Sequence, residues 1–482
     1  MSPWRHSVEV RRRRRQAAVT LVLVLSLAGC LSLAPTYHRP ALPVAERYPV
    51  DAPAPTGSPT DGARIDWHDV FADPDLREAI QTALRNNRDL RKSILQVRES
   101  RALRGIDRAA RWPGLNATTE GIRAGLPDDL GGLQGLPGVL SAYDVTAGAS
   151  WELDFWGRLR NQDAAAFESY LATDAGRRAF AVSLVSQVAG AWLQQRELDD
   201  RIALARRSIA TRSESYRIVK RRYEEGAATR LELTQVETLL NQAETLGIQL
   251  EQERALNGHA LGLLLGVSAP TTTRTGVFDT EDAVRIVAPD LPSQLLTQRP
   301  DIIAAEHRLE AAHANIGAAR AAFFPQVTLT GNIGSASTEL NGLFEAGTRT
   351  WTFMPAITLP IFTGGRLRSN LDLAEARRDI AVADYEATIQ GAFRDVADAL
   401  SRHQYLTRQV EIQRRALGAE TERARLAQLR YESGAEAYLE VLDAQRDLLS
   451  AEQSLVQTQR ALQSSRVSLF AALGGGTLGA GR

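Results

Sequence analysis

The residue with the most distinctive chemistry in this chain of 482 residues is its only cysteine, Cys30. Residues 27–30 read Leu-Ala-Gly-Cys, which matches the bacterial lipobox, where the cysteine is lipidated and becomes the mature N-terminus. A basic run, Arg11–Arg15, and a short apolar stretch over 17–28 precede it, as in a signal peptide. We therefore expect residues 1–29 to be removed and a covalent lipid on Cys30, with no other cofactor.

The residue after the cysteine and the charge balance indicate the compartment. Leu31 stands where lipoproteins retained in the inner membrane typically carry Asp, so we expect the outer membrane. Removing residues 1–29 takes six Arg and one Glu from 57 basic and 57 acidic residues, leaving a net charge of −5. That balance argues against a nucleic-acid partner. Beyond residues 17–28 no apolar run is long enough for a transmembrane helix, so any spanning must use strands.

Two other groupings resemble cofactor or metal motifs but lack the required context. The GxGxxG spacing over 474–479 has no strand before it and no room for a helix after it, which indicates a flexible tail. His307, Glu310 and His313 follow one another at intervals of three on an expected helix, spread over about 120° of its circumference. We expect a solvated face there, no metal site and no enzymatic activity, since no nucleophile elbow or zinc-ligand motif occurs.

A unit of about 200 residues occurs twice in the chain. The sequence Arg-Tyr-Glu-Glu-Gly-Ala at 222–227 returns as Arg-Tyr-Glu-Ser-Gly-Ala at 430–435. Long repeats usually pack as equivalent parts of one architecture. The expected segments are the signal peptide 1–29, a lipid-anchored tail 30–75, repeat 76–267, an equatorial linker 268–292, repeat 293–472 and a flexible tail 473–482.

Each repeat predicts a helix, two strands, a very long helix and a further helix. The apolar positions of the helices are mostly Ala, Leu and Val separated by Gln, Arg and Glu, which is coiled-coil composition. The expected helices cover 76–111, 158–223 and 231–265, and then 300–323, 366–431 and 437–471. The expected strands cover 114–123, 143–155, 326–336 and 351–362.

The strands predict a membrane environment. From Val145 to Phe155 apolar residues alternate with polar ones over eleven positions, the length and pattern of an outer-membrane barrel strand. Glu152 and Asp154 fall on the polar face, where they either make a channel interior acidic or belong to a solvated barrel wall. Aromatic residues near the strand ends suit a membrane belt. Four strands cannot close a barrel, so other copies of the chain must complete it. The expected fold class is mainly α with a transmembrane β-barrel contribution.

At this point the chain resembles the TolC-like outer membrane factor family, and most closely its OprM/NodT-type lipoproteins. The motifs are Trp-Glu-Leu-Asp-Phe-Trp-Gly at 151–157, the stretch 66–74, and Tyr-Leu-Glu-Val-Leu-Asp-Ala-Gln-Arg at 438–446. The resemblance covers residues 30–472. It implies a homotrimer with a twelve-stranded barrel in outer-membrane lipid and a long periplasmic α-barrel. It also implies a tripartite efflux pump with a periplasmic adaptor and an inner-membrane transporter of the RND type.

The same resemblance implies a periplasmic gate at Leu439, Asp443 and Arg446. Their spacings of four and three place them on one helix face, and threefold symmetry would make each a ring. The alternative is an ordinary exposed ion pair worth ~0.5 kcal/mol or less.

The positions that match these gate residues in the first repeat carry no charge. They are Leu231, Gln235 and Thr238.

Two glycines, Gly226 and Gly434, mark the helical hairpin tips, where members of the family dock their adaptor. The alternative is a simple helix C-cap.

The leading interpretation is a passive export duct for efflux. The alternatives are a duct for type I protein secretion, a structural coiled-coil envelope lipoprotein and a periplasmic enzyme.

Overall fold

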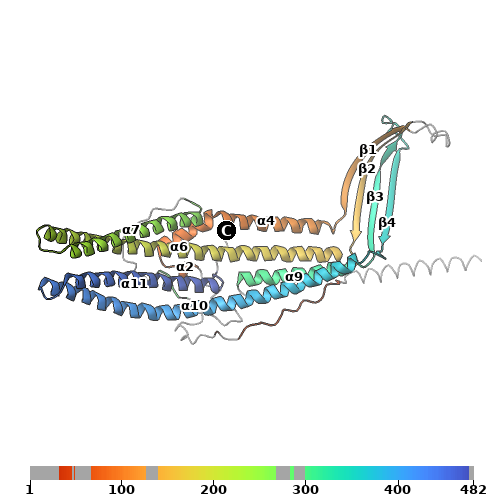
Figure 1. Ribbon diagram of the computed structural model, residues 1–482. Coiled ribbons are helices and arrows are strands. Elements are labelled where there is room, and N and C mark those ends of the chain that lie inside the picture. The colour runs from red at the N-terminus through yellow and green to blue at the C-terminus, as the bar shows by residue number, and fades with distance from the viewer. Residues whose placement is uncertain are drawn as a thin grey trace, which may run out of the picture. The chain divides into compact units, whose positions relative to one another are not determined.

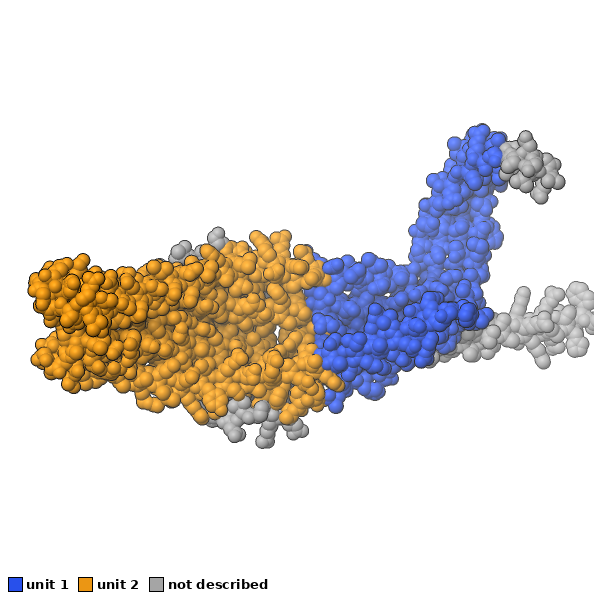
Figure 2. All heavy atoms as spheres, viewed as in Figure 1, with its two compact units in different colours: residues 1–41, 97–173, 305–385 blue, residues 42–96, 174–304, 386–482 orange. Residues whose placement is uncertain are grey.

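The computed structural model describes residues 32–45, 48, 67–125, 139–267, 283–286 and 299–476. Cys30 and most of the expected linker lie outside these residues. The chain forms two compact units (Figure 2). Unit 1 comprises residues 1–41, 97–173 and 305–385, and unit 2 comprises 42–96, 174–304 and 386–482. Each unit takes segments from both repeats, so the compact units do not coincide with the duplicated sequence.

The same order of elements occurs twice along the chain (Figure 1). The first copy contains α4 (Arg88–Ala109), β1 (Gly114–Gly125), β2 (Val139–Leu153), α6 (Arg158–Glu224) and α7 (Arg230–Leu265). The second contains α9 (Pro300–Ala321), β3 (Gln326–Ser337), β4 (Arg349–Thr358), α10 (Arg366–Glu432) and α11 (Tyr438–Ala472). Helices α6 and α10 have 67 residues each and contribute to both units. Among the described residues, no helix combines the length and the apolar composition needed to cross a membrane.

The prediction of one helix over 76–111 is wrong, because Asn87 divides it into α3 (Pro74–Asn86) and α4. Asn87 has an extended backbone with ψ of 128°. Its side-chain oxygen accepts the backbone N–H of Leu90 at 2.9 Å, and its amide donates to the carbonyl oxygen of Leu264 at 2.9 Å. Asn87 therefore caps the start of α4 and links it to the end of α7. The second contact is tertiary, and local sequence does not reveal it.

The four strands form one antiparallel sheet in unit 1, in the order β1-β2-β3-β4 (Figure 1). Each hairpin comes from one repeat, and β2 pairs directly with β3, from Tyr143 opposite Ser337 to Leu153 opposite Val327. Strands β1 and β4 each have one partner among the described residues, so both edges of the sheet are unpaired there. Open edges carry free backbone donors and acceptors, which need pairing by further strands.

The pairing register supports the predicted alternation in the middle of the sheet, whereas Ser335 and Arg349 stand in line with Val145 on the otherwise apolar face. Paired residues share a face, and one row contains only apolar side chains: Ala117, Ala147, Ile333 and Trp351. The adjacent row, on the other face, contains Thr118, Thr146, Gly334 and Thr350. A Cβ on Gly334 would lie 2.1 Å from the carbonyl oxygen of Val145, so only glycine fits that position.

The strand bounds differ from the predictions by at most four residues, most of all in β2 and β4. β2 begins four residues earlier than expected and ends at Leu153, because Asp154 already accepts the backbone N–H of Arg160 and caps the start of α6. β4 ends at Thr358 rather than at 362. The aromatic residues Phe155 and Phe362 therefore lie just beyond strands.

Unit 2 has an apolar core built by both repeats and by the segment before them. Phe71, Leu76 and Ile80 are fully buried against α6, α11 and the short stretch 283–286. The ring of Phe71 meets that of Phe470 edge-on at 5.3 Å. This core holds α6 of the first repeat to α11 of the second.

A buried ion pair reinforces the same contact between α6 and α11. Glu197, with a side chain only 5% exposed, pairs with Arg201 at 3.1 Å and with Arg460 at 2.7 Å. Removing one partner of such a pair would leave an uncompensated buried charge.

Candidate functional site

The candidate gate lies at the start of α11, in unit 2. Ala437 is the N-cap and its side chain forms no capping hydrogen bond, so α11 begins at Tyr438 without a side-chain lock. Leu439 is 49% exposed. Asp443 and Arg446 form an ion pair at 3.1 Å within the helix, as their spacing predicts.

A wider charged cluster surrounds this pair and connects two helices. Arg446 also contacts Asp447 at 3.1 Å. Arg423 of α10 donates to Asp447 at 2.8 Å and to Glu440 at 3.4 Å. The sequence interpretation missed Arg423 and Asp447, although they lie 11 residues before and 13 residues after Gly434, at facing levels of an antiparallel hairpin. The cluster of Arg423, Glu440, Asp443, Arg446 and Asp447, hereafter the gate cluster, therefore joins α10 to α11.

Electrostatics within the gate cluster centre on Asp447 and Arg446. The hydrogen bond from Arg423, and then that from Arg446, lowers the pKa of the Asp447 carboxyl. Arg212 of α6 is 5% exposed and donates to the carbonyl oxygen of Leu239 at 2.7 Å. Burial first, and the like charge of Arg446 second, lower the pKa of Arg212. Arg446 is thus attracted by acidic side chains on its own helix and repelled by the like charge of Arg212 on α6.

Among the residues that the structure describes, the equivalent hairpin end of the first repeat has no such cluster. Leu231 is 67% exposed, and Thr238 donates its hydroxyl to the carbonyl oxygen of Thr234 at 2.8 Å within the helix. α7 is held at its start by a capping box, in which Thr229 and Glu232 each accept the other's backbone N–H.

Both hairpin tips have the same backbone conformation. Gly226 and Gly434 each have φ of 76°, the left-handed conformation that glycine adopts without strain. In each tip the following alanine N–H bonds to the arginine carbonyl five residues back, at 2.7 Å for Ala227 and 2.9 Å for Ala435. These are Schellman caps. The two tips touch, because Arg222 donates to the hydroxyl of Tyr431 at 2.7 Å.

The two acids predicted to line a channel have partners in unit 1. Glu152 forms a bidentate pair with Arg158, at 2.6 and 3.0 Å, and accepts the amide of Gln326 at 2.6 Å. Asp154 caps α6 through the backbone of Arg160 at 2.8 Å. Their charges are compensated locally, and a channel-lining role for Glu152 and Asp154 stays a prediction.

Within unit 1, the segment that follows Cys30 contacts helices α6 and α9. Ser32 donates to the side chain of Asn161 at 3.0 Å, and Arg39 forms a bidentate pair with Glu306 at 2.7 Å. A Cβ on Gly317 would lie 2.8 Å from Ala34, so α9 accepts the segment closely at this glycine.

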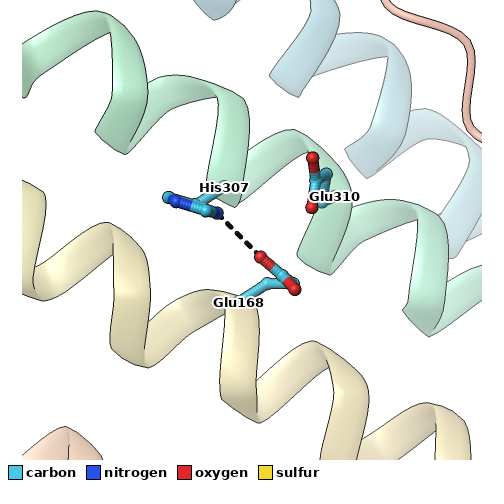
Figure 3. Close-up of side chains that lie close together, drawn as sticks. All are labelled: Glu168, His307 and Glu310. Carbon is cyan, nitrogen blue, oxygen red and sulfur yellow. Dashed lines mark hydrogen bonds and ion pairs between the residues drawn. The ribbon is translucent and has the colours of Figure 1, made fainter. Parts of the chain in front are cut away.

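Structure corrects the expectation of a solvated face at His307, Glu310 and His313. His307 is half-buried and its Nδ1 lies 2.7 Å from a carboxylate oxygen of Glu168 on α6 (Figure 3). Glu310 lies beside them, and one ligand atom from each of the three residues lies within 4.8 Å of the others. His313 is outside this group; its ring meets that of Tyr37 edge-on at 5.4 Å.

The fold and these sites define a class of protein: a helical duct component with a strand sheet for the outer membrane. The sequence profile described as "Outer membrane efflux protein" matches residues 79–267 and 291–475. The chain belongs to this family, and it is an outer-membrane exit duct of tripartite efflux.

Three known proteins illustrate the similarity. The toluene efflux pump outer membrane protein TtgF of Pseudomonas putida is 43% identical over 466 residues, covering 95% of this chain and 96% of TtgF. A crystal structure of a membrane protein from Pseudomonas aeruginosa is 41% identical with a TM-score of 0.85, covering 92% and 100% of the two chains. The open state of the Neisseria gonorrhoeae MtrE outer membrane channel is 36% identical with a TM-score of 0.83, covering 92% and 98%.

Proposed function

We propose that three copies of this chain assemble into a conduit that the gate cluster closes at its periplasmic end. The observation that carries the proposal is the four-stranded sheet, which has a largely apolar face and whose two edges are unpaired among the described residues. Three such sheets joined edge to edge make twelve strands, an even number within the range of outer-membrane barrels. Closing the edges satisfies the backbone groups that lipid cannot.

Mass measurement and conductance test the assembly together. Native mass spectrometry of the purified protein in detergent should give three chains, and planar bilayers containing it should show discrete conductance steps. A monomer that retains its full strand content would contradict the proposal, since a single sheet would then tolerate its open edges.

The partners follow from the family. A periplasmic adaptor would dock at the hairpin tips around Gly226 and Gly434, and an RND-type inner-membrane transporter would supply the energy. The duct needs no chemistry of its own. The exposed tips with rigid Schellman caps support this role, because they present the same backbone shape twice per chain.

Small organic molecules are the cargo we favour over secreted protein. The support is that TtgF, the outer membrane protein of a toluene efflux pump, is 43% identical to this chain. Selection of the cargo would rest with the inner-membrane transporter, so the duct itself needs only to be wide enough.

A lipid on Cys30 would add a second attachment to the membrane. The motif at 27–30 motivates it, and the anchoring of residues 32–39 to unit 1 would hold the lipidated end beside the sheet's own unit. Cys30→Ser should leave an unprocessed, unlipidated precursor in whole-protein mass spectrometry. Trimers should persist, because the barrel anchors them independently. A wild-type mature chain that begins at another residue would disprove the assignment.

A further inference from the structure

We propose that Glu168, His307 and Glu310 form a binding site for one divalent transition-metal ion such as Zn²⁺. The three side chains come from two helices of unit 1, α6 and α9 (Figure 3). His307 and Glu310 are three positions apart, so they project from one face of α9 towards Glu168. Some helical bundles hold metals with a Glu and a His three positions apart on one helix and a carboxylate from a facing helix; here the His precedes the Glu.

The distances suit a metal after a small adjustment. Oxygen and nitrogen ligands of Zn²⁺ lie about 2.0–2.2 Å from the ion, which separates tetrahedral ligands by about 3.3–3.5 Å. The ligand atoms here lie within 4.8 Å of one another, and Nδ1 of His307 lies 2.7 Å from a carboxylate oxygen of Glu168. That hydrogen bond holds a proton, which the ion would replace. The side chains are half-buried and can shift, because each has solvent on one side.

The ligand types select the class of ion. One imidazole nitrogen with two carboxylate oxygens suits Zn²⁺ and related first-row ions. Mg²⁺ and Ca²⁺ prefer oxygen ligands throughout, and soft monovalent ions prefer sulfur. Three protein ligands leave a fourth position for water.

The charges around the cluster favour a divalent cation. Glu168 and Glu310 bring two carboxyl groups close together, and a cation between them would offset the repulsion of their negative charges. Another acid on α9, Glu306, already has partners: Arg39 at 2.7 Å and the hydroxyl of Tyr37 at 3.2 Å. Glu306 is therefore not available as a ligand, and the two charges of the cluster match those of the ion.

Such an ion would link the two repeats. Glu168 belongs to the first repeat and His307 and Glu310 to the second, and α9 also holds the N-terminal segment through Glu306. A bound metal would thus stiffen unit 1 without taking part in transport. Binding should weaken at acidic pH, because protons compete for His307 and the carboxylates.

Zn²⁺ binding to the purified, untagged full-length protein tests the proposal. After dialysis against EDTA, isothermal titration with ZnCl₂ and elemental analysis should give one ion per chain, with a rise in melting temperature. Glu168→Gln, His307→Gln and Glu310→Gln should each weaken binding by about tenfold or more and remove that rise. His313→Gln is the matched control, because it lies on the same helix outside the cluster.

Two results would overturn the site. One is no stoichiometric Zn²⁺ binding by the wild type at micromolar concentrations. The other is equal binding by the wild type and by the triple variant Glu168→Gln/His307→Gln/Glu310→Gln. Circular dichroism and native mass should show that each variant folds and assembles. If a single variant misfolds, the remaining two variants and the wild-type stoichiometry still decide.

Discussion

The two hairpin ends of unit 2 have the same backbone conformation at the tip, but different interactions hold the helix that follows each tip. Both tips use a glycine with φ of 76° and a Schellman cap. In the first repeat, Thr229 and Glu232 lock the start of α7 through a capping box. In the second, α11 starts at the uncapped Ala437, and ion pairs from Arg423 tie it to α10 instead.

The difference shows how a duplicated fold acquires an asymmetric function. Backbone geometry is inherited by both copies because the cap needs only a glycine at the right place. Side chains then diverge: Ser215, Gln235 and Thr238 stand where the second repeat has Arg423, Asp443 and Arg446. Hydrogen bonds of a capping box are local, whereas exposed ion pairs respond to salt, pH and neighbouring chains. If the proposed gate operates, the second hairpin is therefore the one expected to open and close.

Removing the gate charges should have the largest effect. Asp443→Ala/Arg446→Ala should raise the open population of a trimer about tenfold, if in the closed trimer these charges contribute ~0.5 kcal/mol per chain to contacts between neighbouring chains and three chains act together. Single-channel conductance in planar bilayers measures it. Asp443→Ala alone should act in the same direction but more weakly, since Arg446 then faces Arg212 with Asp447 but not Asp443 to offset its charge.

The first repeat provides the control for the gate variants. Gln235→Ala/Thr238→Ala removes no charge and should leave conductance unchanged. Equal conductance of the Asp443→Ala/Arg446→Ala trimer and the wild type would assign closure to Leu439 or to helix packing.

Removing the N-cap side chain of α7, or adding one to α11, should have an effect of intermediate size on the stability of the helix starts. Thr229→Ala removes the capping box and should destabilise the first turn of α7 by ~1 kcal/mol, seen as about fivefold faster hydrogen exchange there. Ala437→Thr should slow exchange at the start of α11, because Glu440 already occupies the third helical position of a capping box. That substitution should also lower conductance. If exchange slows and conductance does not change, mobility of the α11 start is not what opens the duct.

Lowering the pH should have the smallest effect on conductance. Arg423 and Arg446 lower the pKa of Asp447 below its ordinary value of about 3.9. The carboxylate of Asp447 therefore contributes its full stabilisation to the gate cluster above about pH 4. That stabilisation is lost as pH falls through the lowered native pKa. Conductance should rise by no more than a few fold between pH 5 and pH 3, because exposed pairs are well screened. Asp447→Asn should abolish that part of the pH response; an unchanged response would place it elsewhere.

Periodicity and motif spacing were enough to predict most of the architecture. The 67-residue helices α6 and α10 begin at the predicted Arg158 and Arg366, because a long coiled-coil pattern is a strong local signal. The strand faces followed from a period of two, which the register supports in the middle of the sheet. The i,i+3 pair of Asp443 and Arg446 was also local, and it forms as expected.

Contacts between distant segments were beyond such reasoning. Asn87 breaks a helix because Leu264 and the end of α7 are there to receive it. Arg423 joins the gate cluster from 24 residues away from Asp447, and Arg212 approaches from the other repeat. Glu168 meets His307 across 139 positions, so a pattern that looked like a solvated helix face is one side of a half-buried cluster. Sequence by itself determined the elements, their duplication and the polarity of their faces, because these depend on neighbours within a few residues. Tertiary structure alone decided which charges meet, because that depends on which helices pack together.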